Sequence, residues 1–384
     1  MKRRTRRPCL QASAAFALLT IVGAARGERV HAAGASAQTA ARAEASTSDR
    51  LARVQRALFS GGADIHAAIR ELKAILAIDP GSRDAHALLG IAYRGLGTQE
   101  FIAEAVAEFR QALAIDPHDA PTRLYLAYAY RDLGRLERAR EELQTALAQA
   151  PGNPQVLALL GDTERQLGNP GRAVELARQA LAADPQFVQA RYYLGLALID
   201  VGRREDGIRE IEQVVRSGMP VADAYLALGT AYLEGNRVRD AIDILSRGVA
   251  IDASRPDLRI RLARALRTSG ELAQAETQLA QAAAGRTGSR LEQQQLESDL
   301  ALEQGLLRLA EGKLATAAGA LQRVLKMDPD HGPANRGLAT IYLRQGAYAR
   351  AAEHAARADR AGAPLGDAER ELLRQKVGRI PEAM

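Results

Sequence analysis

The residues best able to bind a metal ion or to move a proton near neutral pH are the six histidines. No two of them have the His-Glu-x-x-His spacing that places two metal ligands on one face of a helix. They are His31, His66, His86, His118, His331 and His354. We therefore expect solvated surface histidines, and neither a metal site nor a metal cofactor.

Motifs for covalent catalysis and for phosphate binding are also absent from the sequence. No Gly-x-Ser-x-Gly elbow is present, and apart from the adjacent Gly61 and Gly62 the glycines stand singly at predicted helix ends rather than in a phosphate-binding loop. Because no catalytic residues and no cofactor motif can be named, the sequence predicts a protein that is not an enzyme. A regulatory subunit acting on a partner enzyme, or an enzyme with an unrecognised site, is the alternative.

The first 37 residues differ in character from the rest of the chain. A basic start, Lys2 to Arg7, is followed by an apolar run from Leu10 to Val22 and then by small residues, which is the order of a secretory signal peptide. The run is shorter than the roughly 20 apolar residues of a membrane-spanning helix. We predict export to the periplasm or the outer face of the membrane, with cleavage near Ala25 or near Ala37. Only an uncleaved leader would attach the protein to a membrane.

The positive charge of the chain lies in this same leader. The formal net charge is +6, and residues 1–37 contain seven basic residues and one acidic residue. The body of the protein is therefore close to neutral, which predicts no nucleic-acid partner. The single cysteine, Cys9, is also in the leader. Residues 38–48, rich in Ala, Ser and Thr, are predicted to form a flexible linker.

The remaining residues are predicted to form pairs of short amphipathic helices. In residues 122–133 apolar side chains recur at helical spacing, and Gly134 ends that helix. The same spacing returns in residues 136–149, and Pro151 ends the second helix. Neither helix can bury its apolar stripe alone, so the pair must pack against its neighbours.

This unit recurs along the chain with four marks in one register. A proline ends the unit, a small residue lies within the first helix, a glycine lies between the two helices, and another small residue lies within the second helix. In addition, an Asp before the proline can hydrogen-bond within the turn. The closing prolines are Pro80, Pro117, Pro151, Pro185 and Pro329, and the aspartates are Asp79, Asp116, Asp184 and Asp328. The small residues allow close approach of the two backbones, where larger side chains would overpack.

The chain resembles the tetratricopeptide repeat family, most clearly at Leu89, Gly90, Tyr93, Ala105, Phe109, Ala112 and Pro117. The resemblance covers residues 49–365 in about nine units, and residues 366–384 are predicted to form a terminal capping helix and tail. It implies an all-α, right-handed α-solenoid (superhelix) of stacked antiparallel helix pairs. Together with the leader it suggests an exported, bacterial-type member of that family.

Two insertions interrupt the register. Three extra residues at 98–100 predict a longer turn between the helices of their unit. About eight extra residues at 290–297, preceded by the capping box Ser289-x-x-Glu292, predict a helix that starts about two turns early and protrudes from the array.

The resemblance also implies a concave binding groove lined by the first helix of each unit. Carried over position by position, the groove residues that we predict to bind a partner are Arg94, Tyr128, Arg131, Arg165, Tyr192, Leu196 and Arg267. An arginine series beside an apolar, tyrosine-bearing strip would accept a protein or peptide segment that carries carboxylates. The alternative is that these arginines simply keep exposed helix faces solvated.

These observations predict a non-enzymatic scaffold or assembly factor that binds an unidentified protein or peptide partner. The relatives that the leader suggests imply work in the cell envelope. The lysine and asparagine of the chaperone-tail clamp found in some family members are replaced here by Ala87 and Ile91, so that type of partner is not expected.

Overall fold

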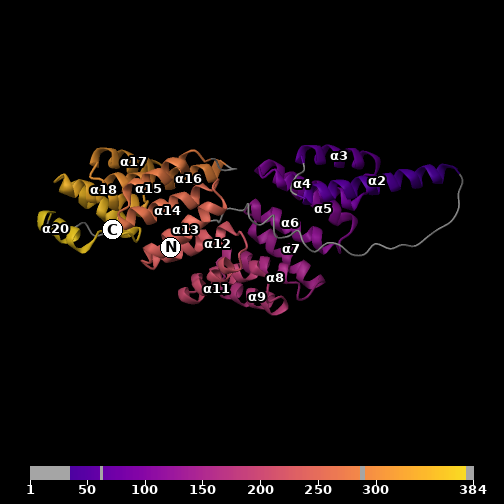
Figure 1. Cartoon of the computed structure of the whole chain (residues 1–384), viewed down its shortest axis with the longest axis horizontal. Helices are drawn as coiled ribbons and strands as arrows, with labels where there is room; N and C mark the ends of the chain where they lie inside the picture. Colours follow the sequence, from indigo (N-terminus) through magenta and orange to yellow (C-terminus); the bar gives the residue numbers. More distant parts are fainter. Residues whose placement is uncertain (1–34, 61–63, 286–289, 378–384) are drawn as a thin grey trace. The chain divides into compact units, whose positions relative to one another are not determined.

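The computed structural model describes residues 35–60, 64–285 and 290–377. These residues form nineteen α-helices and no β-strand (Figure 1). The predicted all-α architecture of stacked helix pairs is therefore confirmed. Most of the predicted leader, residues 1–34, lies outside the described part of the chain. None of the described helices combines the length and the apolar character needed to cross a membrane.

Helices α2 to α19 follow one another as nine pairs, each made of a first and a second helix, and α20 comes after the last pair. The pairs are α2 (Ala35–Phe59) with α3 (Ile65–Ile78), α4 (Arg83–Gly95) with α5 (Gln99–Ile115), α6 (Ala120–Asp132) with α7 (Leu136–Gln149), α8 (Pro154–Gln166) with α9 (Pro170–Ala183), α10 (Val188–Asp200) with α11 (Arg204–Arg216), α12 (Ala222–Glu234) with α13 (Val238–Ile251), α14 (Pro256–Ser269) with α15 (Leu272–Ala283), α16 (Arg290–Ala310) with α17 (Leu314–Met327), and α18 (Gly332–Arg344) with α19 (Tyr348–Arg360). Helix α20 spans Asp367–Val377.

The two helices of a pair approach closely because small residues lie where they cross. A Cβ atom added to Gly90 of α4 would lie 2.6 Å from the ring of Phe109 in α5, so the ring occupies the space that a side chain would need. Phe109 itself is completely buried. The turn between the helices takes the left-handed backbone conformation, with φ of 69° at Gly134 and 57° at Asn236.

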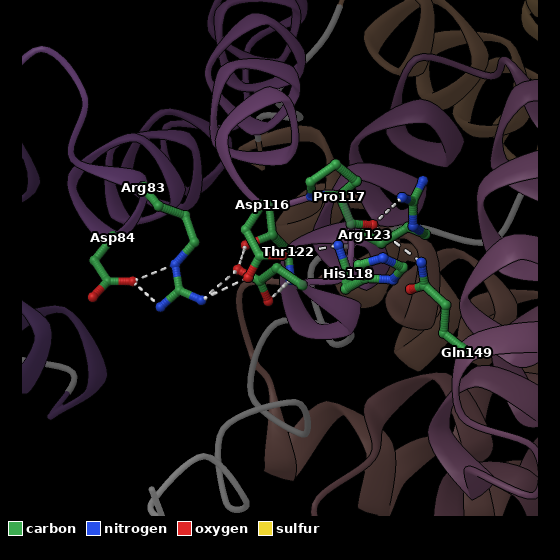
Figure 2. Close-up of polar contacts among 9 residues, drawn as sticks. Arg83, Asp84, Asp116, Pro117, His118, Thr122, Arg123 and Gln149 are labelled. Carbon is green, nitrogen blue, oxygen red and sulfur yellow. Dashed lines mark hydrogen bonds and ion pairs between the residues drawn. The ribbon is translucent and has the colours of Figure 1, made fainter. Parts of the chain in front are cut away.

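The turn between successive pairs is held by the aspartate that precedes the closing proline, as predicted. At the α5–α6 turn, Asp116 Oδ1 accepts a hydrogen bond from the backbone N–H of His118 at 3.0 Å (Figure 2). The carbonyl oxygen of Pro117 accepts hydrogen bonds from Arg123 Nη2 at 2.7 Å and Gln149 Nε2 at 3.0 Å (Figure 2). The closing turn is therefore tied to both helices of the next pair.

The chain divides into two compact units, Met1–Asp223 and Ala224–Met384. In the first unit, α9 and α10 share an apolar cluster that includes Val174, Ala177 and Leu194. In the second unit, Leu321 of α17 and Leu338 of α18 lie in a cluster built from three consecutive helices. Each cluster joins a second helix to the first helix of the next pair, which is how one pair completes the core of its neighbour.

The capping helix α20 closes the second unit. Leu373 is completely buried against Ala351, Ala355 and Leu365, whereas the rest of α20 is largely exposed. Leu373 shields the end of the apolar core, whereas Leu372 and Val377 of the same helix stay exposed with its charged residues on the outer face.

Two details of the sequence prediction were wrong. Residues 38–48 are not a linker in the structure, because α2 is helical from Ala35; its alanine-rich start has high helix propensity. The three extra residues at 98–100 lengthen α5 rather than the turn before it. Thr98 caps this 17-residue helix by accepting a hydrogen bond from the N–H of Phe101 at 3.4 Å.

The insertion at 290–297 does start its helix early, since α16 begins at Arg290 and runs for 21 residues. Leu296 within the insertion is buried, and Gln294 and Gln295 are exposed. The extra turns of α16 therefore pack at least one side chain, Leu296, into the second unit. Ser289 of the predicted capping box lies outside the described residues.

Candidate functional site

The predicted groove arginines of the first unit form a series of ion pairs between successive first helices. Arg94 Nε of α4 donates to Asp132 Oδ2 of α6 at 2.7 Å, and Arg131 of α6 donates to Asp162 of α8. Arg165 Nη1 of α8 donates to Asp200 Oδ2 of α10 at 3.1 Å. Each arginine thus reaches one pair forward along the array. We call these three arginines and three aspartates the ion-pair series.

Asp162 is the centre of the ion-pair series. Its carboxylate accepts hydrogen bonds from Arg131, from Arg165 Nε at 2.8 Å and from Gln166 Nε2 at 2.8 Å. The side chains of Arg131 and Asp162 are only 3% and 2% exposed. Burial alone would raise the pKa of the Asp162 carboxyl, but the cations of Arg165 and Arg131 outweigh it, and the net effect lowers this pKa. Asp162 therefore stays ionised in the folded protein at neutral pH.

The predicted tyrosines also pack within the array. The ring of Tyr128 is 3% exposed and lies under the Arg94 guanidinium, 5.0 Å from ring centroid to Cζ. Burial raises the pKa of the Tyr128 phenol. Tyr192 of α10 is 8% exposed, and its hydroxyl donates to the carbonyl oxygen of Asp223 at 3.4 Å. Beside them Leu196 of α10 is half-buried.

Arg267, the predicted groove arginine of the second unit, has an equivalent arrangement. Its Nε and Nη2 atoms donate to Glu303 Oε2 of α16 at 3.2 and 3.1 Å. Glu303 is almost completely buried, and Arg264 Nε lies 3.9 Å from its other oxygen. The pattern of an arginine engaged by a carboxylate of the next first helix therefore occurs in both units.

Sequence reasoning found the arginines but missed the carboxylates that hold them. The separations in sequence are 38, 31, 35 and 36 residues for the pairs of Arg94, Arg131, Arg165 and Arg267. These values scatter around one repeat length. A search for an acidic residue about one repeat after each groove arginine would have shown that the arginines are structural partners as well as candidate binding residues.

The structure brings together five of the predicted groove residues, Arg94, Tyr128, Arg131, Arg165 and Tyr192, and Leu196 lies one turn after Tyr192 on α10. They differ in what they offer a partner. The guanidinium of Arg131 is enclosed. Arg165 is held at Nε by Asp162, and its Nη1 atom faces Asp200, whose side chain is 44% exposed. Binding of a partner at these residues stays a prediction.

The histidines are not all solvated, so that part of the prediction was wrong. His86 Nδ1 lies 2.6 Å from Glu108 Oε2, and its Nε2 lies 3.1 Å from the carbonyl oxygen of Pro80. His354 is half-buried and bonded to Asn335. His86 lies in the first turn of the first helix α4 and contacts the closing turn at Pro80, whereas His354 lies in the second helix α19 and contacts the first helix α18 at Asn335; both therefore hold structure. Within the described residues, no three His, Cys, Asp or Glu side chains gather as metal ligands.

Comparison with family models identifies the same repeats. Models of the tetratricopeptide repeat match residues 101–162, 159–200, 194–256 and 302–365. Together these matches cover more than half of the chain. No curated protein sequence matches the chain.

Solved structures share the fold at low sequence identity. The chain is 15% identical to a chain of the Cut9–Hcn1 hetero-tetramer of the APC/C, with a TM-score of 0.63 over 84% of this chain and 62% of that one. It is 17% identical to a tetratricopeptide repeat protein from Parabacteroides merdae, with a TM-score of 0.54 over 67% and 99% of the two chains. It is 20% identical to human IFIT1, crystallised as a dimer with PPP-AAAA, with a TM-score of 0.53 over 82% and 72%. The chain spans less than two-thirds of the first of these relatives, and these likenesses show the fold alone.

Proposed function

This chain belongs to the tetratricopeptide repeat family, and we propose that it is a non-enzymatic scaffold that binds a protein or peptide partner along the first helices of its repeats. Proteins of this family generally mediate protein–protein interactions. The observation that carries the proposal is the common register of the first helices, in which Arg131 of α6 pairs with Asp162 of α8 and Arg165 of α8 pairs with Asp200 of α10. A repeated register is what allows one extended segment to contact several repeats in turn.

Within this surface, Arg165 and Leu196 are the residues that we propose to contact the partner. Nε of Arg165 is fixed on the buried Asp162, so the guanidinium is already oriented before a partner arrives. Its Nη1 atom contacts Asp200 Oδ2 at 3.1 Å; the Asp200 side chain is 44% exposed and that of Arg165 is 13% exposed. A partner carboxylate could replace Asp200, the exposed member of this pair, without breaking the buried contact between Arg165 and Asp162. Leu196, half-buried on α10, supplies apolar area on the first helix that follows α8.

Arg94, Arg131 and the two tyrosines have a different part in the proposal. They hold α4, α6, α8 and α10 in register, and a rigid surface loses less entropy when a partner binds. The predicted carboxylate-bearing segment is therefore recognised by one oriented guanidinium at the end of the ion-pair series, rather than by a row of free arginines.

Site-specific photo-crosslinking in cells tests this proposal. A photoreactive phenylalanine analogue is placed at Leu196 of α10, and in the matched control at Gln179, which is exposed on the second helix α9. We expect a crosslinked partner from position 196 that is lost when Arg165→Glu is added, and none from position 179. Equal crosslinking from both positions would place the binding surface elsewhere.

We also propose that the protein works outside the cytoplasm, as a scaffold or assembly factor of the cell envelope. The support is the leader, with its basic start, its apolar run at Leu10 to Val22 and its small residues. A fusion of residues 1–48 to a reporter enzyme that is active only after export tests this. Reporter activity is expected for the natural leader and not when Leu18 and Leu19 are replaced by Arg. An inactive natural fusion would refute export.

A further inference from the structure

A basic pocket on the first unit of the chain shares no lining residue with the ion-pair series. It has a volume of about 500 Å³ and is lined by Arg110, Tyr130, Arg135, Arg138 and Glu142. These residues come from α5, from α6, from the turn before α7 and from α7 itself. Two successive repeats therefore build one pocket whose wall carries three cations and one carboxylate.

The positive charge of this pocket is largely uncompensated by the protein. Neither Arg110 nor Arg135 forms an ion pair or a side-chain hydrogen bond with any residue that the structure describes, and both side chains are exposed. Arg138 Nη1 contacts Glu141 at 3.0 Å, but both side chains are more than half exposed, so this pair is weak. The one acidic lining residue, Glu142, is already engaged by Arg123 Nη1 at 2.6 Å. Glu137, in the first turn of α7, is a further acidic neighbour along the chain.

The same turn recurs in two later repeats, where its charge is cancelled. Arg203 Nε donates to Asp206 at 2.6 Å, and Arg237 Nε donates to Asp240 at 2.7 Å. Arg203 and Arg237 occupy the register of Arg135, and the two aspartates occupy the register of Arg138. The protein thus holds a second arginine here, in the place where these two repeats hold the neutralising carboxylate.

The backbone of the turn is the same in all three repeats, so only the side chains differ. The N–H of Arg135 donates to the carbonyl oxygen of Tyr130 at 2.8 Å, and the N–H of Arg237 donates to that of Tyr232 at 2.8 Å. Arg237 also stacks on Tyr232, with 4.1 Å between guanidinium and ring centroid. In the later repeat, Arg237 is therefore engaged by both Asp240 and Tyr232. In the repeat of Arg135, the corresponding guanidinium has no carboxylate partner among the described residues and keeps its positive charge uncompensated.

We propose that this pocket binds a phosphate monoester. Three guanidinium groups face one carboxylate, which leaves about two positive charges, and a phosphate monoester carries about −1.5 to −2 at pH 7. A single carboxylate carries half of that charge. Guanidinium groups bind phosphate oxygens through paired N–H donors, so two or three arginines around one pocket can share the three free oxygens. This site is independent of the protein-binding surface proposed above.

Calorimetric titration of the full chain at constant ionic strength tests the proposal. The probes are inorganic phosphate and an otherwise neutral peptide with one phosphoserine, with chloride as the reference. The test variant is Arg138→Asp, which installs the residue found at Asp206 and Asp240. The control is Arg172→Asp, the same charge change at the same register one repeat later, where Arg172 pairs with Glu175 on the exposed surface at 2.7 Å.

We expect saturable phosphate binding by the natural protein and by Arg172→Asp, and at least tenfold weaker binding by Arg138→Asp. Tighter binding of the phosphopeptide than of inorganic phosphate would identify a phosphorylated protein as the source, and equal binding would identify the free phosphate group. Binding that Arg138→Asp leaves unchanged, or that chloride reproduces, overturns the proposal. A peptide with glutamate in place of phosphoserine that binds equally well also overturns it. Should Arg138→Asp fail to fold by circular dichroism, Arg110→Ala, at an exposed site, gives the same test.

Discussion

Replacing Asp162 by Asn removes the negative charge at the centre of the ion-pair series while keeping the size of the side chain. In the natural protein this carboxylate accepts hydrogen bonds from Arg131, Arg165 and Gln166 and is 2% exposed. The substitution leaves the cation of Arg131 buried with no anion beside it. Loss of one partner from a buried ion pair lowers stability by about 3–5 kcal/mol, because the remaining buried charge is neither hydrated nor compensated by an opposite charge.

The expected loss of stability in the Asp162→Asn protein is large because the ion pair is buried, so an exposed ion pair provides the control. Arg172 and Glu175 lie 2.7 Å apart in α9 with both side chains more than half exposed. Substitution of Glu175 by Gln should change stability by less than about 1 kcal/mol. The two substitutions remove the same charge from pairs of the same type, and differ in the solvation of the charge that remains.

Hydrogen exchange measured by mass spectrometry is the suitable assay, because a repeat array opens locally and has no single unfolding free energy. We expect the opening free energy of peptides from α6 and α8 to fall by several kcal/mol in the Asp162→Asn protein and to stay unchanged in the Glu175→Gln protein. A fall of less than about 1 kcal/mol in the Asp162→Asn protein would refute the reasoning, since it would show that Arg131 is well solvated.

The pH dependence of stability provides a second check of the contribution of the Asp162 carboxylate. The pKa of Asp162 is lowered in the folded protein, so its ionised form stabilises the fold at every pH above the unfolded value near 4. This contribution is lost as pH falls through the lowered pKa. The difference between the natural protein and the Asp162→Asn protein should therefore be constant above about pH 4 and shrink on further acidification. Replacement of the pair by apolar residues, Arg131→Met with Asp162→Leu, should recover much of the lost stability.

Other predictions concern packing and a second titrating group. Gly207→Ala should lower stability by about 1–3 kcal/mol despite the better helix propensity of alanine, because the new Cβ would lie 2.5 Å from the carbonyl oxygen of Gly195. By contrast, Gly319→Ala, where the new Cβ would lie in open space on α17, should raise stability by about 0.5–1 kcal/mol. Thermal unfolding of the two variants checks the opposite signs, and a stabilised Gly207→Ala would contradict the packing. Burial lowers the pKa of His354, which donates to Asn335 Oδ1 at 2.8 Å, so stability should fall as pH drops below about 6.5. This fall should vanish in His354→Gln, as measured by denaturant unfolding between pH 5 and 8.

Much of the local structure could be predicted from residue types and spacing. The helix pair at residues 122–149 follows from apolar side chains at helical spacing and from Gly134, and the structure places α6 and α7 there. The hydrogen bond of Asp116 in its turn was predicted for the same reason. These features depend on residues within one helix or one turn, so the sequence contains all the information that they need.

The errors arose where one position can serve two local structures. The three extra residues at 98–100 could lengthen a turn or a helix, and Thr98 decides for the helix by capping it. The alanine-rich residues 38–48 have the composition of a linker and the propensity of a helix, and α2 forms through them. His86 is polar and near a turn, and only its distance of 2.6 Å from Glu108 on α5 shows that it is a structural residue.

The sequence by itself determined that this protein is an array of paired helices with arginines at a repeated position of the first helix. It could not determine what those arginines contact, because their aspartates lie between 31 and 38 residues away and meet them only when successive pairs stack. The same holds for Arg110, Arg135 and Arg138, which share a pocket only because α5 and α7 both pack against α6. The periodicity of residues close together in the chain specifies each helix. The carboxylate that pairs with each arginine belongs to the next repeat, and only the tertiary structure brings the arginine and the carboxylate together.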